Sequence, residues 1–236
     1  MTTATKAPPL RRWHYDIEQG SPEWADLRLG IITASAIGGL LTGSGAIANN
    51  ATSRGLYHRL LAERITGEAD DSFSNMHTMR GHLLEPYARE LYARDHAHDA
   101  VSECGFVTSV IEGVTLGYSP DGLVGSDGLI EIKSRLAKHQ LALLLSPSEP
   151  VPSEYMAQLQ AGMLITGRQW CDFVSYSPGL PLYVYRVTPD PGMVTTMIQA
   201  AKVTESWISD GWERYQRLLE QSPATPKVNI DQEIIL

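Results

Sequence analysis

The segment Ser119-Pro120-Asp121-Gly122, followed ten residues after its aspartate by Glu131-Ile132-Lys133, forms the pattern PD-(x)9-ExK. The glutamate and the lysine are two positions apart, so on a β-strand their side chains point to the same face. Between the two segments, the stretch 125–128 contains two glycines and an aspartate flanked by apolar residues, which predicts a β-hairpin. We therefore expect two carboxylates and an ammonium group to converge at one end of a hairpin.

Two acids and a lysine in this arrangement are typical of a metal-dependent phosphodiesterase. Close carboxylates resist full ionisation unless a cation lies between them, and hard oxygen ligands suit Mg²⁺ or Mn²⁺ better than Zn²⁺. Such an ion can polarise a phosphate and activate bound water, which the lysine would orient or deprotonate. A plainer interpretation remains open for so short a pattern: Asp121 forms a turn, and Glu131 and Lys133 are a surface pair.

Length and composition are consistent with a globular protein. The 236 residues, 43% of them hydrophobic, can bury a sizeable core, and we expect a single domain over residues 1–236. Residues 1–12 are expected to form a flexible arm without the apolar segment of a signal peptide, and residues 222–236 a polar tail. No apolar run is long enough for a membrane helix, and two cysteines without CxxC spacing suit a reducing cytoplasm.

The net charge of −8 argues mildly against a nucleic-acid partner, because nucleic-acid-binding domains are usually basic. A local basic groove is nevertheless compatible with an acidic exterior, and the acids of a metal site add to the total.

The order of predicted elements indicates a mixed α/β fold with helices on the flanks of the sheet. Helices are expected at 22–28, 33–41, 52–65, 76–96, 134–145, 153–165 and 192–219, and strands at 101–110, 114–118, 170–176 and 182–187, besides the hairpin. Ser21, Thr33, Thr52 and Ser153 are the expected N-caps, and Pro86 is expected to kink its helix or mark a boundary.

Residues outside the hairpin are candidates for the same site. Glu85 could be a third metal-binding acid, although an exposed helical glutamate is the simpler interpretation. Gln158 could hydrogen-bond to the attacking water, although helical glutamines are usually solvated. Arg28, Thr33, Ser35 and Ser119 are residue types suited to a phosphate pocket, because arginine is a permanently charged forked donor and hydroxyls are neutral donors. Arg28 could equally be an ordinary surface arginine, and Thr33 simply a cap.

Four histidines, at positions 77, 82, 96 and 98, have spacings that match no standard zinc site, so we expect them on the helix surface.

Several motifs in order resemble the phage lambda exonuclease and YqaJ-type viral recombinase nucleases, which belong to the PD-(D/E)xK superfamily. They are the segments Gln19–Trp24, Leu27–Ser35, Arg80–Glu85, Tyr118–Leu123, Leu129–Lys133 and Tyr155–Gln160. The resemblance spans about Gln19 to Tyr185, and the ordered set is more specific than any one motif.

The resemblance implies a restriction-endonuclease-like core with a central mixed β-sheet flanked by helices. It also implies a Mg²⁺-dependent enzyme that degrades one strand of linear double-stranded DNA from the 5′ end to mononucleotides, with Mn²⁺ as a substitute metal. The remaining 3′ overhang would pass to a single-strand annealing protein for phage-type homologous recombination. A ring-shaped homotrimer around the DNA, with no membrane association, and action in the cytoplasm of a bacterial host complete these expectations.

By the same resemblance, Asp121, Glu131, Glu85 and the backbone carbonyl of Ile132 would bind the metal. Lys133 would position or activate water with the help of Gln158, and Arg28, Ser35, Ser119 and Thr33 would hold the terminal 5′ phosphate.

One segment departs from the family pattern. In the lambda exonuclease, the loop after the Thr-Ala-Ser segment supplies a basic phosphate contact, whereas residues 42–53 here contain no lysine or arginine. Arg54, Arg135, Lys138 or His139 could substitute. Two alternatives to an exonuclease stay open: a structure-specific or restriction-like endonuclease, and a non-catalytic module that binds DNA ends.

Overall fold

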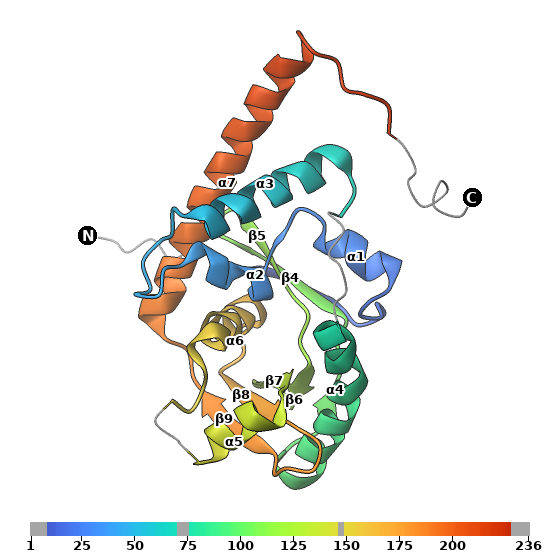
Figure 1. Cartoon of the computed structure of the whole chain (residues 1–236), viewed down its shortest axis with the longest axis vertical. Coiled ribbons are helices and arrows are strands. Elements are labelled where there is room, and N and C mark those ends of the chain that lie inside the picture. Colours follow the sequence, from blue (N-terminus) through green and yellow to red (C-terminus); the bar gives the residue numbers. More distant parts are fainter. Residues whose placement is uncertain (1–8, 70–75, 146–148, 228–236) are drawn as a thin grey trace.

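Two mixed β-sheets, each bordered by helices, make up the protein (Figure 1). The computed structural model describes residues 9–69, 76–145 and 149–227, without the side chains of residues 76–79. Most of the expected arm (1–8), the end of the expected tail (228–236) and the side chain of His77 therefore lie outside the described residues. The mixed α/β class with flanking helices is confirmed.

The first sheet has the strand order β1-β4-β5-β2. Its strands are β1 (Leu10–His14), β4 (Phe106–Ile111), β5 (Val114–Tyr118) and β2 (Ile32–Thr33). Neighbours are antiparallel except β2, which runs parallel to the end of β5. The prediction of a flexible arm is wrong for residues 10–12, because they form part of β1, which pairs with β4 from Leu10 opposite Val110 to His14 opposite Phe106.

The second sheet has the order β3-β6-β7-β8-β9 and contains the predicted hairpin. Its strands are β3 (Val101–Ser102), β6 (Gly122–Val124), β7 (Gly128–Ser134), β8 (Trp170–Tyr176) and β9 (Tyr183–Val187). The hairpin is antiparallel, with Gly122 opposite Ile130, whereas β7 and β8 are parallel. Parallel neighbours need a crossover connection, and the helices between β7 and β8 provide it.

The helices are α1 (Pro22–Arg28), α2 (Ala34–Ile37), the short 3₁₀ helix η1 (Gly38–Leu40), α3 (Ala51–Thr66), α4 (Met76–Asp95), α5 (Ala137–Leu145), α6 (Ser153–Thr166) and α7 (Pro191–Leu219). Helix α6 lies between the sheets and contacts strands of both (Figure 1). Helix α4 covers β7 and β8, α3 packs on α7, and the last turns of α7 project from the body (Figure 1). One apolar cluster includes residues of both sheets, such as Leu116 and Phe173.

Helix ends follow local chemistry, with some differences from expectation. Ser21 caps α1 by accepting the Trp24 N–H, as predicted. The cap of α3 is Asn50 rather than Thr52, because Asn50 and Ser53 form a reciprocal capping box. Ser153 is the first residue of α6 rather than its cap.

Thr33 is at the predicted N-cap position of α2, but its side chain makes no capping hydrogen bond. Pro86 does not mark a helix boundary, because α4 continues through it. Among the described residues, no helix is both long and apolar enough to cross a bilayer.

Candidate active site

A single cavity of about 310 Å³ brings together all of the predicted site residues. Its lining includes Arg28, Thr33, Ser35, Glu85, Ser119, Asp121, Glu131, Ile132, Lys133 and Gln158. We call Glu85, Asp121, Glu131, Ile132, Lys133 and Gln158 the carboxylate side, and Arg28, Thr33, Ser35 and Ser119 the hydroxyl side. The two sides meet at the end of β5, where Ser119 and Asp121 are two residues apart.

The hairpin places the carboxylate side. Glu131 and Lys133 share one face of β7, whereas Ile130 and Ile132 pack into a small apolar cluster with Tyr92 and other residues, as the alternation of a strand predicts. Asp121 precedes β6, and its Oδ2 accepts a hydrogen bond of 2.6 Å from the Ile132 backbone N–H. This bond crosses the hairpin, so the carboxylate of Asp121 is held beside β7.

Glu131 is only 1% exposed, and both of its oxygens are hydrogen-bonded. Its Oε1 accepts from Lys133 Nζ at 2.7 Å and from Gln158 Nε2, and its Oε2 accepts from the Tyr118 hydroxyl at 2.7 Å. Lys133 Nζ also donates to Gln158 Oε1 at 3.2 Å. A buried carboxylate needs such partners, so Glu131 is fixed in place by strand β5, strand β7 and helix α6.

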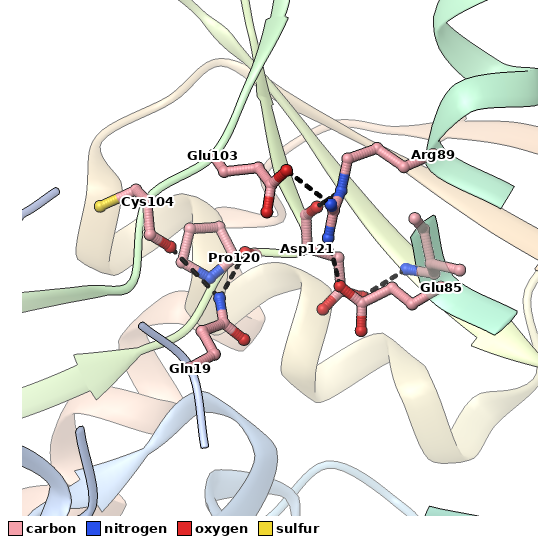
Figure 2. A network of polar contacts seen from close by, with 8 residues as sticks. Gln19, Glu85, Arg89, Glu103, Cys104, Pro120 and Asp121 are labelled. Atoms are coloured by element: carbon pink, nitrogen blue, oxygen red, sulfur yellow. Dashed lines mark hydrogen bonds and ion pairs between the residues drawn. The ribbon is translucent and has the colours of Figure 1, made fainter. Parts of the chain in front are cut away.

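Glu85 enters the cavity from helix α4 and forms an ion pair with Arg89 one turn later (Figure 2). Arg89 also donates to the backbone carbonyl of Asp121 at 2.6 Å. On the other side of this loop, Gln19 Nε2 donates to the carbonyls of Cys104 and Pro120 at 3.2 and 3.0 Å (Figure 2). Side chains from two distant segments thus hold the main chain around Asp121.

The charges of the carboxylate side are not balanced. Burial and the nearby Glu131 and Glu85 carboxylates raise the pKa of Asp121 well above its usual value. Burial also raises the pKa of Glu85, although Arg89 opposes the shift. Burial lowers the pKa of Lys133, but Glu131 and Asp121 outweigh it, so the net pKa is raised. Three acids near two cations, Lys133 and Arg89, therefore leave an excess of negative charge when ionised.

This donor set fits a divalent cation with a preference for oxygen. Carboxylates and a backbone carbonyl are ligands typical of Mg²⁺, and unbalanced carboxylates are the condition that a bound cation relieves. Within the part of the chain that the structure describes, no three His, Cys, Asp or Glu side chains are arranged as a ready-made metal cluster. The residues that fit the ion are Asp121, Glu131 and the Ile132 carbonyl, with Glu85 at the edge.

The hydroxyl side is arranged around Ser119. The Ser119 hydroxyl accepts hydrogen bonds from Trp24 Nε1 at 2.8 Å and from Arg28 Nη1 at 3.2 Å. The Arg28 guanidinium lies over the Trp24 ring, 4.1 Å from its centroid, and the hydroxyls of Thr33 and Ser35 are 3.2 Å apart. A forked cation with three hydroxyls is chemically suited to a phosphate monoester.

None of the four proposed basic substitutes is among the described residues that line the main cavity. Arg54 hydrogen-bonds to Asn49, Arg135 lies 5.8 Å from the Tyr155 ring centroid, and Lys138 and His139 are exposed on α5.

A second cavity of about 180 Å³ shares Arg28 and Thr33 with the main one and is lined also by Arg59 of α3. Sequence reasoning missed Arg59 because no local pattern links it to Arg28.

Other residues line the main cavity without having been assigned a site role. Tyr118 is the hydrogen-bond donor to Glu131, and Gln19 supports the loop before Asp121; both lie in motifs noted for their resemblance. His82, expected only on the helix surface, is exposed and also lines the cavity. Its position three residues before Glu85 on α4 is the signal that could have identified it.

Comparisons with known proteins show which family and which solved structures this chain is similar to. The family model of the YqaJ-like viral recombinase domain matches residues 23–169. The crystal structure of an alkaline exonuclease from Laribacter hongkongensis has 32% sequence identity and a TM-score of 0.74, over 85% of this chain and 99% of that chain. The same exonuclease in complex with dAMP gives a TM-score of 0.73, with the same identity and coverage.

A phage-related exonuclease from Haemophilus somnus 129PT has 11% identity and a TM-score of 0.57, over 78% of this chain and 96% of that chain. At that identity the likeness shows the fold alone. A search among curated proteins gave no match.

Proposed function

This chain belongs to the family of YqaJ-like viral recombinase domains, and on that premise we propose that it is a Mg²⁺-dependent 5′→3′ exonuclease. It degrades one strand of linear double-stranded DNA to mononucleotides and leaves a 3′ overhang for a single-strand annealing protein. Mn²⁺ substitutes for Mg²⁺. The chain acts as one nuclease domain, as a homotrimer around DNA, in the cytoplasm of a bacterial host. The similarity to an alkaline exonuclease at 32% identity supports the nuclease assignment.

The observation that carries this proposal is the adjacency of the two sides in one cavity. The carboxylate side has the acids and the lysine of a phosphodiesterase, and the hydroxyl side has the donors for a phosphate monoester. A phosphate monoester exists only at the end of a strand. A pocket for it next to the cleavage residues therefore favours removal of terminal nucleotides over cleavage within a strand.

The residues of the chain divide the chemical work. Asp121, Glu131, Glu85 and the Ile132 carbonyl would hold the metal ion, which would supply positive charge for the phosphate and lower the pKa of water. The Lys133 ammonium has three N–H donors, of which two go to Glu131 and Gln158. Among the described residues no third acceptor is hydrogen-bonded to Lys133, so the third N–H would serve the attacking water or a phosphate oxygen. Gln158 hydrogen-bonds to both Lys133 and Glu131 and so fixes their relative positions. Arg28, Ser35, Ser119 and Thr33 hold the terminal phosphate.

The test is digestion of linear duplex DNA labelled at either the 5′ or the 3′ end, with Mg²⁺ or with EDTA, beside a closed circle. Metal-dependent release of the 5′ label as a mononucleotide, with the circle intact, is the expected result. A cut circle would identify an endonuclease. Binding to ends without cleavage in Mg²⁺ or Mn²⁺ would identify a binding module and remove the catalytic roles given above.

A further inference from the structure

Arg89 lies outside the predicted set of site residues, yet it joins three segments, two of which, helix α4 and the turn before β6, line the acidic part of the cavity (Figure 2). Its side chain is 16% exposed. Nε donates to the Asp121 carbonyl at 2.6 Å, Nη1 pairs with Glu103 Oε1 at 2.8 Å, and Nη2 pairs with Glu85. One guanidinium thus connects helix α4, the loop between β3 and β4, and the turn before β6.

The shape of the guanidinium explains why an arginine occupies this position. Its N–H donors lie in a fixed plane and point in different directions, so three acceptors around that plane are held at fixed relative positions. A lysine ammonium is a compact charge at the end of a flexible stem. It would keep the positive charge near Glu85 but would not span the Asp121 carbonyl and Glu103 at the same time.

The three contacts differ in strength. The Glu103 side chain is 71% exposed, so its ion pair with Arg89 is screened by water and contributes little. The side chains of Glu85 and Arg89 are 21% and 16% exposed, so that pair lies in a less hydrated place and constrains the carboxylate more strongly. The bond to the Asp121 carbonyl is independent of carboxylate charge. Arg89 therefore stays anchored to the main chain whatever Glu85 binds.

We propose that Arg89 is a positioning residue that sets the affinity of the carboxylate side for the divalent cation, by fixing the Glu85 carboxylate and the main chain of Asp121. This inference rests on the proposed function. Removing a hydrogen-bond partner of metal ligands typically weakens metal binding about 10–100-fold. The positive charge of Arg89 acts in the opposite direction, because it repels a cation, so the sign of the effect separates geometry from charge.

The experiment measures Mn²⁺ binding without DNA, by the electron paramagnetic resonance signal of free Mn²⁺, for the full chain and for Arg89→Lys and Arg89→Gln. Thermal unfolding of each variant checks the fold. We expect both variants to bind Mn²⁺ about 10–100-fold more weakly than the unsubstituted chain. Arg94→Lys is the matched control, because Arg94 lies on the same helix, is exposed and pairs only with Asp95 among the contacts described. It should bind Mn²⁺ as the unsubstituted chain does, and so should Glu103→Gln, within about threefold.

Two results would overturn the inference: Arg89→Lys binding Mn²⁺ as the unsubstituted chain does, which would leave only a charge effect, or either Arg89 variant binding more tightly. A further variant, Asp121→Asn, removes a proposed metal ligand and so distinguishes failure of this inference from failure of the proposed function. If the unsubstituted chain binds Mn²⁺ no better than Asp121→Asn, the metal site itself is wrong. If the unsubstituted chain binds Mn²⁺ better than Asp121→Asn does, but the Arg89 variants bind it as well as the unsubstituted chain, only the role of Arg89 is wrong.

Discussion

The carboxylate side and the hydroxyl side of the cavity are built in opposite ways. On the carboxylate side, Glu131 is 1% exposed and is already hydrogen-bonded through both oxygens to Tyr118, Lys133 and Gln158. On the hydroxyl side, Thr33 is buried but Ser35 is exposed, and among the described contacts the Arg28 side chain makes one hydrogen bond, to Ser119, besides its stacking on Trp24. One side is preorganised by the protein, and the other offers donors to a ligand.

This difference separates two tasks within one cavity. Fixed, buried charges can stabilise charge that develops during a reaction without reorganisation at that moment. Accessible donors contribute binding energy to a group that is already charged before the reaction. Substitutions on the carboxylate side should therefore reduce cleavage of every DNA end, whereas substitutions on the hydroxyl side should reduce discrimination between kinds of end.

Lys133→Ala should have the largest effect. Loss of a preorganised donor at the reacting phosphate typically lowers kcat about 10²–10³-fold, and duplex binding should change little because other residues hold the end. Single-turnover cleavage together with DNA binding measures both. Lys202→Ala, an exposed lysine on α7, is the control. Cleavage by Lys133→Ala within a few fold of the unsubstituted rate would remove Lys133 from the reaction.

Arg28→Ala should act selectively. A hydrogen bond to a charged group contributes about 1.5–3 kcal/mol, or about 10–150-fold, and only a 5′-phosphorylated end gains it fully. kcat/KM should therefore fall on 5′-phosphorylated duplex far more than on the same duplex with a 5′-hydroxyl. Arg214→Ala, an exposed arginine on α7, is the control. Equal losses on both substrates would place Arg28 outside the phosphate pocket.

Tyr118→Phe should weaken the carboxylate side without changing the preference for one kind of DNA end. It removes the donor to Glu131 Oε2 and leaves a buried carboxylate oxygen without its partner. The cost to the free energy of unfolding is about 1–3 kcal/mol. Thermal unfolding measures it, and cleavage should decline equally on 5′-phosphorylated and 5′-hydroxyl ends. A change in preference between the two ends would show that Tyr118 serves the hydroxyl side instead.

Ser119→Ala should have the smallest effect. In the proposed pocket the Ser119 hydroxyl would donate one neutral hydrogen bond to the phosphate besides accepting one from Arg28, so about 0.5–1.5 kcal/mol, or about 2–10-fold, should be lost on phosphorylated ends. Ser126→Ala, in the exposed turn of the hairpin, is the matched control. The KM values on the two kinds of end provide the measurement, and a larger loss on 5′-hydroxyl ends would contradict it.

The two sides also differ in how far sequence reasoning reached. The hairpin from Asp121 to Lys133 was predictable because its turn residues and strand alternation are local. The bond from Tyr118 to Glu131 and the position of Arg59 beside Arg28 have no local pattern. Strand β1 was missed for the same reason, since its Leu10 pairs with Val110 far along the chain. The convergence of Glu85 and Gln158 on the hairpin was expected chiefly from the family resemblance.

The most direct test of the division between the two sides is a preference ratio: kcat/KM on 5′-phosphorylated duplex divided by kcat/KM on the same duplex with a 5′-hydroxyl. It is measured with Mg²⁺ for the unsubstituted chain, Lys133→Ala and Arg28→Ala. The account predicts that Lys133→Ala lowers both rates and keeps the ratio, whereas Arg28→Ala brings the ratio close to one. A ratio lost in Lys133→Ala or kept in Arg28→Ala would contradict it.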